Sequence, residues 1–279
     1  MANTTSLVGG VFIPEIWSAE ITRSFENERV MAKLVSRFDA DVRSKGDVVH
    51  IPNLSSITAT YKVQGSEVPS SATTETEVTI TVDKWAVARV TVEDILKKQS
   101  SYDLMKEYTG KLGQAIAEIQ DDDIMSLYTS FSTTIGATSS NVGLAKTYLL
   151  GAIRTLDANN VPRNDRHFVV EAYGLEDLRS MDEFVKYDTT GEAGHYGTDA
   201  RMKFFGVEIH QTNNLPVTTS LVSALMFHRE ALAMAQQKGI NVQSEYSARH
   251  LDTALVADIL YGVKARRTTA AVRVQYGQV

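Results

Sequence analysis

The alternation of apolar and polar residues is clearest between residues 46 and 92, where it predicts a β-hairpin. β-branched residues gather in 48–63, a polar stretch follows at 64–75, and residues 76–82 then alternate strictly. Strand character continues beyond this point with a change of phase near Lys84, which is typical of a β-bulge. The pattern therefore predicts two long strands joined by a polar tip.

This hairpin is too long to be covered by its own chain. Two strands of about 15 residues, at about 3.3 Å per residue, would reach about 50 Å. An isolated hairpin is marginal in water, so we expect a neighbouring subunit to cover it. Val78, Ile80 and Val82 share one face with no evident partner inside the chain. Inter-subunit contacts are expected from Lys62, Glu67, Val78, Ile80 and Val82, and from Trp17 nearer the N-terminus. Trp85 fits either an interface or the core.

The rest of the chain mixes helical and strand periods, which indicates an α+β fold. Residues 1–45 contain a short amphipathic stretch but no core of their own. Apolar residues at spacings of three and four predict a helix from Ser100 or Ser101 to about Thr133. Further helices are expected from Asn141 to before Pro162, around Leu175 to Met181, and over 230–237. Strands are expected at 167–171, 204–209, 221–227, 240–246 and 265–276.

Composition narrows the class of protein without naming a function. The 279 residues are 43% hydrophobic and 22% charged, as in ordinary soluble proteins. Cysteine is absent, which excludes disulfides and thiolate sites. No secretory signal pattern or membrane span is recognisable, so we expect no membrane partner.

The chain carries a net charge of −6, but its C-terminal segment is basic. No acidic residue follows Asp258, but four basic residues do, at Lys264, Arg266, Arg267 and Arg273. They could face a polyanion such as packaged DNA, or lie on the solvent side of a final strand.

No catalytic constellation is recognisable, and we expect no enzyme, no cofactor and no metal site. Asp121, Asp122 and Asp123 are consecutive, so on a helix they point about 100° apart and cannot converge on one ion. A solvated helix face or an interface with basic residues explains them better. The glycine-rich loop at 188–199 carries metal-ligand residue types in no known spacing. A hydrolase with an unrecognised site stays open as an alternative.

The order of these segments resembles the Hong Kong 97-type capsid fold of tailed bacteriophages. The phrases that carry the resemblance are GDVVHIPNL, TVDKWAVARVTVEDILKKQSSYDLM, RHFVVEAYGLEDLRS, FFGVEIHQTNNLP, ALMFHREALAMA and LYGVKARRTTAAVRV. Each is weak alone, but together they span nearly the whole chain in the family's order.

The resemblance implies a division of the chain into five parts. These are an N-terminal arm (1–45), an extended hairpin loop (46–92), a peripheral domain with the spine helix (93–140), an axial α/β domain with some peripheral strands (141–255), and a C-terminal strand returning to the peripheral domain (256–279).

The resemblance also implies a role as a major capsid protein that assembles in the host cytoplasm into an icosahedral shell around double-stranded DNA. The implied partners are copies of itself in hexamers and pentamers, a separate scaffolding protein, a portal, a decoration protein and packaged DNA bound non-specifically. A nanocompartment subunit of the same fold is the first alternative. A β-rich surface-binding module is a second alternative, which the long helix and the missing secretion signal disfavour.

Overall fold

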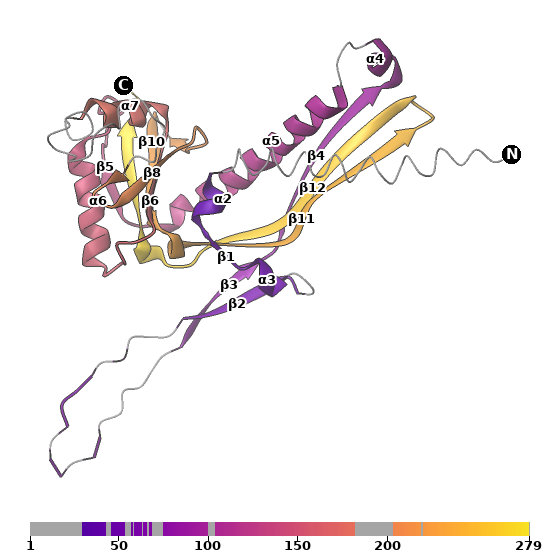
Figure 1. Ribbon diagram of the computed structural model, residues 1–279. Helices are drawn as coiled ribbons and strands as arrows, with labels where there is room; N and C mark the ends of the chain where they lie inside the picture. The colour runs from indigo at the N-terminus through magenta and orange to yellow at the C-terminus, as the bar shows by residue number, and fades with distance from the viewer. Residues whose placement is uncertain are drawn as a thin grey trace.

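The computed structural model describes residues 30–42, 46–53, 57, 59–62, 64–65, 67–68, 75–99, 104–181, 203–218 and 220–278. Its main elements form two sheets and a protruding hairpin (Figure 1). One sheet is elongated and lies beside a long helix, and the other belongs to a compact α/β unit at one end of it. Trp17 and the loop at 188–199 lie outside the described residues.

The elongated sheet has the strand order β1-β11-β12-β4. Its strands are β1 (Ser36–Arg37), β11 (Leu232–Ser247), β12 (Asp252–Ala265) and β4 (Lys84–Glu93). The helix α5 (Leu104–Ser126) runs along it and continues into the 3-10 helix η1 (Leu127–Ser130). The predicted spine helix is thus confirmed over these residues, ending slightly earlier than Thr133.

The contact between α5 and the elongated sheet follows from the spacing of side chains, which repeats about every 3.6 residues in a helix and every two in a strand. Leu112, Ile116 and Ala117 lie on one side of the helix and pack against alternate residues of β12, among them Leu255 and Ile259. Every second residue of β4 also packs toward this cluster, and the residues between them point to the opposite face. One face of the elongated sheet is therefore core.

The hairpin is shorter than the sequence pattern predicted. Its strands β2 (Val48–Asn53) and β3 (Thr76–Thr81) pair antiparallel from Val48 with Thr81 to Asn53 with Thr76. The strand-like segment after Lys84 is not part of it, because β4 pairs with β12 over its whole length. The change of phase near Lys84 therefore marks the passage of the chain from one sheet to another, and the expected β-bulge was wrong.

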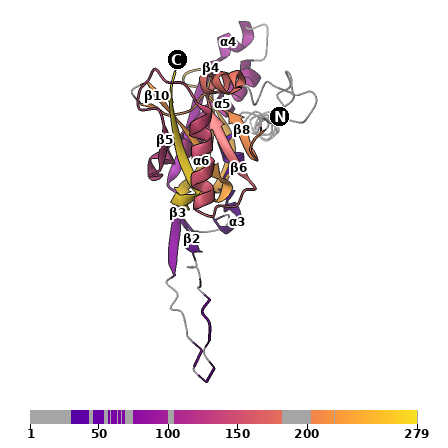
Figure 2. The same cartoon turned by 90° about the vertical axis from the view of Figure 1, so that its left-hand side faces the viewer.

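The α/β unit is built on the strand order β5-β13-β10-β6-β8-β7, with β9 paired to β10. Figure 2 shows α6 (Lys146–Ala158) lying across this unit. The strand β6 (Arg166–Val170) is buried along its whole length and leads into α7 (Ala172–Ser180). The other strands are β5 (Thr134–Gly136), β7 (Lys203–Phe204), β8 (Val207–Gln211), β9 (Val217–Thr218), β10 (Leu221–His228) and β13 (Ala271–Gly277).

Two sequence expectations were wrong in the second half of the chain. Residues 230–237 are not a helix, because the 3-10 helix η2 (Arg229–Ala231) leads directly into β11. Pairing with β12 and β1 overrides the high helix propensity of the local Ala, Leu, Met and Gln residues. The helix α6 begins at Lys146, after an extended Ala145, and not at Asn141.

The C-terminal segment also differs from the expected single returning strand. β12 lies beside α5 as far as Ala265, whereas β13 pairs with β10 in the sheet of the α/β unit. Short elements complete the description: α2 (Met31–Leu34), α3 (Asp39–Val42), α4 (Asp94–Gln99) and η3 (Thr268–Ala270). No helix among the described residues is long and apolar enough to cross a membrane.

Candidate functional site

The described part of the hairpin tip protrudes far from the rest of the chain (Figures 1 and 2). Its residues are all exposed, including Lys62 and Glu67. Three large apolar side chains also lie in water: Ile57 is 75% exposed, Val68 is 68% exposed and Tyr61 is fully exposed. No described residue covers these apolar side chains on the thin extension, which makes the tip a candidate contact surface.

The base of the hairpin is different, and here the sequence interpretation needs correction. Ile80 is completely buried and Val82 nearly so, in a small core with Val49, Ala233 and Ala235. The expectation that they have no partner inside the chain was therefore wrong. Their partners come from β2 and from β11, which lies about 150 residues later, so the alternation alone could not identify them. Val78 is half-buried, and its contact with another subunit stays a prediction.

A second exposed apolar surface lies on the face of the elongated sheet opposite α5. Trp85 is 69% exposed and Val87 is 48% exposed, which excludes the interpretation of Trp85 as a core residue. The indole Nε1 of Trp85 donates a hydrogen bond of 3.0 Å to Asp258 Oδ2, and Lys238 Nζ donates to the same oxygen. Burial alone would raise the pKa of Asp258, but the hydrogen bonds from Lys238 and Trp85 hold it below its usual value. The indole is thus held in place on an open face.

The four basic residues near the C-terminus lie in three different environments. Lys264 is exposed on β12. Arg266 and Arg267 lie 3.9 and 3.4 Å from Glu230 Oε2, and Arg266 also lies over the ring of Phe38. Arg273 Nε donates to Thr134 Oγ1 at 3.0 Å. Their contact with DNA stays a prediction.

The three consecutive aspartates of α5 separate as expected: Asp122 is exposed and Asp123 pairs with a basic residue, but Asp121 is buried. Asp121 is 3% exposed and its Oδ2 accepts hydrogen bonds from the backbone amides of Val30 and Met31. Burial raises the pKa of Asp121 to about 6, despite these hydrogen bonds. Asp123 accepts from Lys84 Nζ at 2.7 Å and from the hydroxyl of Tyr261. Asp121 and Asp123 therefore fasten neighbouring segments to the helix.

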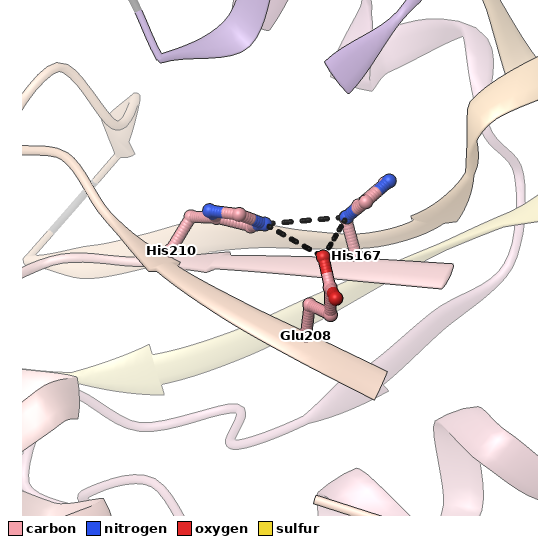
Figure 3. A group of neighbouring side chains, drawn as sticks. All are labelled: His167, Glu208 and His210. Atoms are coloured by element: carbon pink, nitrogen blue, oxygen red, sulfur yellow. Dashed lines mark hydrogen bonds and ion pairs between the residues drawn. The ribbon is translucent and has the colours of Figure 1, made fainter. Parts of the chain in front are cut away.

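One group of side chains in the α/β unit was missed by the sequence analysis. His167 of β6 lies beside Glu208 and His210 of β8, with their polar atoms turned toward one another (Figure 3). The Nδ1 atom of His167 is 3.2 Å from Nε2 of His210 and 3.7 Å from Oε2 of Glu208. Burial, followed by the nearby His210, lowers the pKa of His167 to about 4.

A weak signal for this group was present in the sequence. Glu208 and His210 alternate on one strand and so share a face. The parallel register of β6 with β8, which places His167 opposite Glu208, depends on tertiary structure and could not be read from spacing.

Comparison with known proteins identifies the class of the chain. The sequence model of the family described as "Phage capsid protein" matches residues 32–276. No curated protein sequence shows a significant match. The comparisons lend no support to a nanocompartment or a surface-binding module.

Solved structures agree with this family over nearly the same length. The structure titled "Mycobacterium phage Che8" is 28% identical, with a TM-score of 0.73 over 88% of this chain and 90% of that one. The capsid structure of the cyanophage P-SCSP1u is 18% identical, with a TM-score of 0.74 over 90% and 89%. The mature capsid of bacteriophage PhiM1 is 15% identical, with a TM-score of 0.68 over 90% and 88%. The chain, with its long helix α5, protruding hairpin and α/β unit, belongs to the phage capsid protein family and is a major capsid protein of the Hong Kong 97-type fold, a structural component of the virion.

Proposed function

We propose that copies of this chain assemble as hexamers and pentamers into the icosahedral head of a tailed phage, with the hairpin tip of each copy lying on a neighbouring copy. The observation that carries the proposal is the exposure of Ile57, Tyr61 and Val68 on an extension that no other described part of the chain covers. Lys62 and Glu67 lie between them on the same tip and supply charges of both signs for pairing across the contact.

Burial of the tip would contribute a modest but repeated free energy to a subunit contact. Burial of a side chain of the size of isoleucine or valine contributes about 1.5–3 kcal/mol. Ile57 and Val68 would each supply that amount, and Tyr61 would add its ring. One such contact per subunit is modest, but a closed shell repeats it in every copy.

The open face of the elongated sheet is proposed as a second contact with a neighbouring copy. Trp85 and Val87 provide apolar area there, and the hydrogen bond from Trp85 to Asp258 fixes the orientation of the indole. A large aromatic side chain already held in one orientation loses little entropy on binding, and tryptophan is a common anchor at interfaces.

The remaining parts of the proposal follow from membership of the family. Assembly takes place in the bacterial cytoplasm, guided by a separate scaffolding protein and completed by a portal and a decoration protein. Lys264, Arg266, Arg267 and Arg273 would face packaged double-stranded DNA and contact it without sequence specificity. The chain acts as a structural protein and carries out no catalysis.

Deletion of residues 57–68, with a short Gly-Ser linker in their place, tests the role of the tip. The deletion keeps β2, β3 and the core around Ile80, so the subunit should retain its helical circular dichroism signal and a cooperative melt. Electron microscopy should show no closed particles. Normal shells from this variant would refute the role of the tip, and global unfolding would show that the tip packs within its own subunit.

A matched pair of variants separates the apolar contact from chain length. Replacing Ile57, Tyr61 and Val68 together by serine should prevent closed particles. The conservative replacements Ile57→Val, Tyr61→Phe and Val68→Ile should permit them, because apolar area is retained. Equal assembly of both variants would contradict an apolar contact at the tip.

A further inference from the structure

We propose that His167, Glu208 and His210 form a binding site for a divalent transition-metal ion of the zinc type. The three residues come from two adjacent strands of the α/β unit, and Figure 3 shows their polar atoms directed at a common point. The proposal does not depend on how the subunits assemble.

The distances between the three atoms match those of ligands around one ion. His167 Nδ1 lies 3.2 Å from His210 Nε2 and 3.7 Å from Glu208 Oε2, and the remaining separation is 4.0 Å. A point equidistant from the three atoms would lie about 2.1 Å from each, within the roughly 2.0–2.2 Å of zinc bonds to imidazole and carboxylate. Little rearrangement would be needed to admit the ion.

The backbone of β6 and β8 places all three ligands on one face of the sheet. His167 is the direct partner of Glu208 in the parallel register of β6 with β8, and His210 lies two residues further on the same face of β8. Sites on strands keep their geometry better than sites on loops. The side chain of His167 is almost completely buried, while those of Glu208 and His210 retain partial exposure, which leaves a route for the ion.

The ligand types define the class of ion. Two imidazoles and one carboxylate suit zinc and its neighbours in the transition series, whereas calcium and magnesium prefer oxygen ligands alone. Three protein ligands leave a fourth tetrahedral position for water. Lys203 Nζ lies 3.2 Å from Glu208 Oε1, the carboxylate oxygen that does not face the histidines. Its charge would weaken binding, but the lysine side chain is 60% exposed and can turn into solvent.

A bound ion would join β6, in the interior of the sheet, to β8, near its edge. Among the described strands, only the two-residue β7 lies beyond β8 in this sheet. The ion would therefore cross-link the weaker edge of the α/β unit to its centre, and should raise the melting temperature of the subunit.

Metal binding by the full chain tests the proposal directly. The purified protein is stripped with a chelator and titrated with Zn²⁺ by calorimetry, and with Co²⁺ to look for the intense visible absorption of a tetrahedral site. We expect one ion per chain, at least tenfold weaker binding in Glu208→Gln and in His210→Asn, and a higher melting temperature with Zn²⁺. The control is His50→Asn, because His50 also lies beside a glutamate, Glu77, at 3.1 Å but on the exposed hairpin.

The outcomes are distinguishable from a loss of folding. Both site variants change partly exposed side chains, so their melting temperatures without metal should match that of the parent chain. No zinc uptake by the parent chain, or equal loss of uptake in His50→Asn, would overturn the proposal. Binding that persists unchanged in both His210→Asn and Glu208→Gln would overturn it as well.

Discussion

Gly262 of β12 lies where the chain leaves the hairpin and crosses the elongated sheet. A Cβ atom at this position would be 2.8 Å from the carbonyl carbon of Thr81 and 3.0 Å from Cα of Val82, and closer still to the Thr81 carbonyl oxygen. Ordinary carbon–carbon contacts lie at about 3.5–4.0 Å. Gly262→Ala would therefore force the two backbones apart by roughly 1 Å.

The obstacle at Gly262 is backbone, which cannot rotate away as a flexible side chain could. Overpacking of this kind costs about 1–3 kcal/mol of unfolding free energy. The control is Gly110→Ala in α5, where a Cβ would meet no heavy atom within 4 Å apart from its chain neighbours and the helix's own backbone. Alanine in a helix interior is favoured over glycine by about 0.5–1 kcal/mol, so this variant should be stabilised.

Urea denaturation of the unassembled subunit, followed by far-ultraviolet circular dichroism, measures both effects. The two substitutions add the same methyl group and should change stability in opposite directions. A Gly262→Ala variant within about 0.5 kcal/mol of the parent chain would refute the close crossing of β12 and the hairpin exit.

Two further substitutions test the core and the buried carboxylate. Ile80→Ala should lower the unfolding free energy by about 2–5 kcal/mol, because Ile80 is completely buried. Ile57→Ala should change it by less than about 0.5 kcal/mol. Similar urea midpoints for the two variants would contradict the placement of Ile80 in the core. The pKa of Asp121 is raised from 3.8 to about 6, so its contribution to stability is complete below pH 4 and is lost as the pH rises through 6, a change of about 3 kcal/mol. Asp121→Asn keeps an acceptor for the amides of Val30 and Met31 and should remove this part of the pH dependence in melts between pH 4 and 8; an unchanged profile would show that Asp121 ionises normally.

Much of the architecture could be predicted because its signals are local. The helical spacing from Leu112 to Ile116 and the alternation through Ile80 are set by residues near in sequence, so they identify α5 and β3. The apolar run from Phe168 to Val170 likewise predicts the buried strand β6.

The errors arose where partners distant in sequence decide the outcome. Residues 232–237 have the composition of a helix, and only their pairing with β12 and β1 makes them a strand. The local sequence predicts that Ile80 lacks a partner inside the chain, because β11, which packs against it, is distant in sequence. The cluster of His167 with His210 depends on the register of a parallel pair whose strands are some 40 residues apart.

The first residues of β11, a strand of the elongated sheet, connect that sheet with both the α/β unit and the base of the hairpin. Successive residues from Leu232 to Ala235 point alternately into two cores, as the period of a strand requires. Leu232 and Met234 pack in the core of the α/β unit, and Ala233 and Ala235 pack against the base of the hairpin. Alanine is small enough to let Ile80 approach the strand, and larger side chains there would hold the hairpin away. Two of these four residues belong to each core, so the same short segment joins both. The hairpin is therefore fixed at its base while its tip extends beyond the subunit. A fixed base and a free tip are what a projecting assembly contact needs, since the tip can then meet a neighbour in one defined direction.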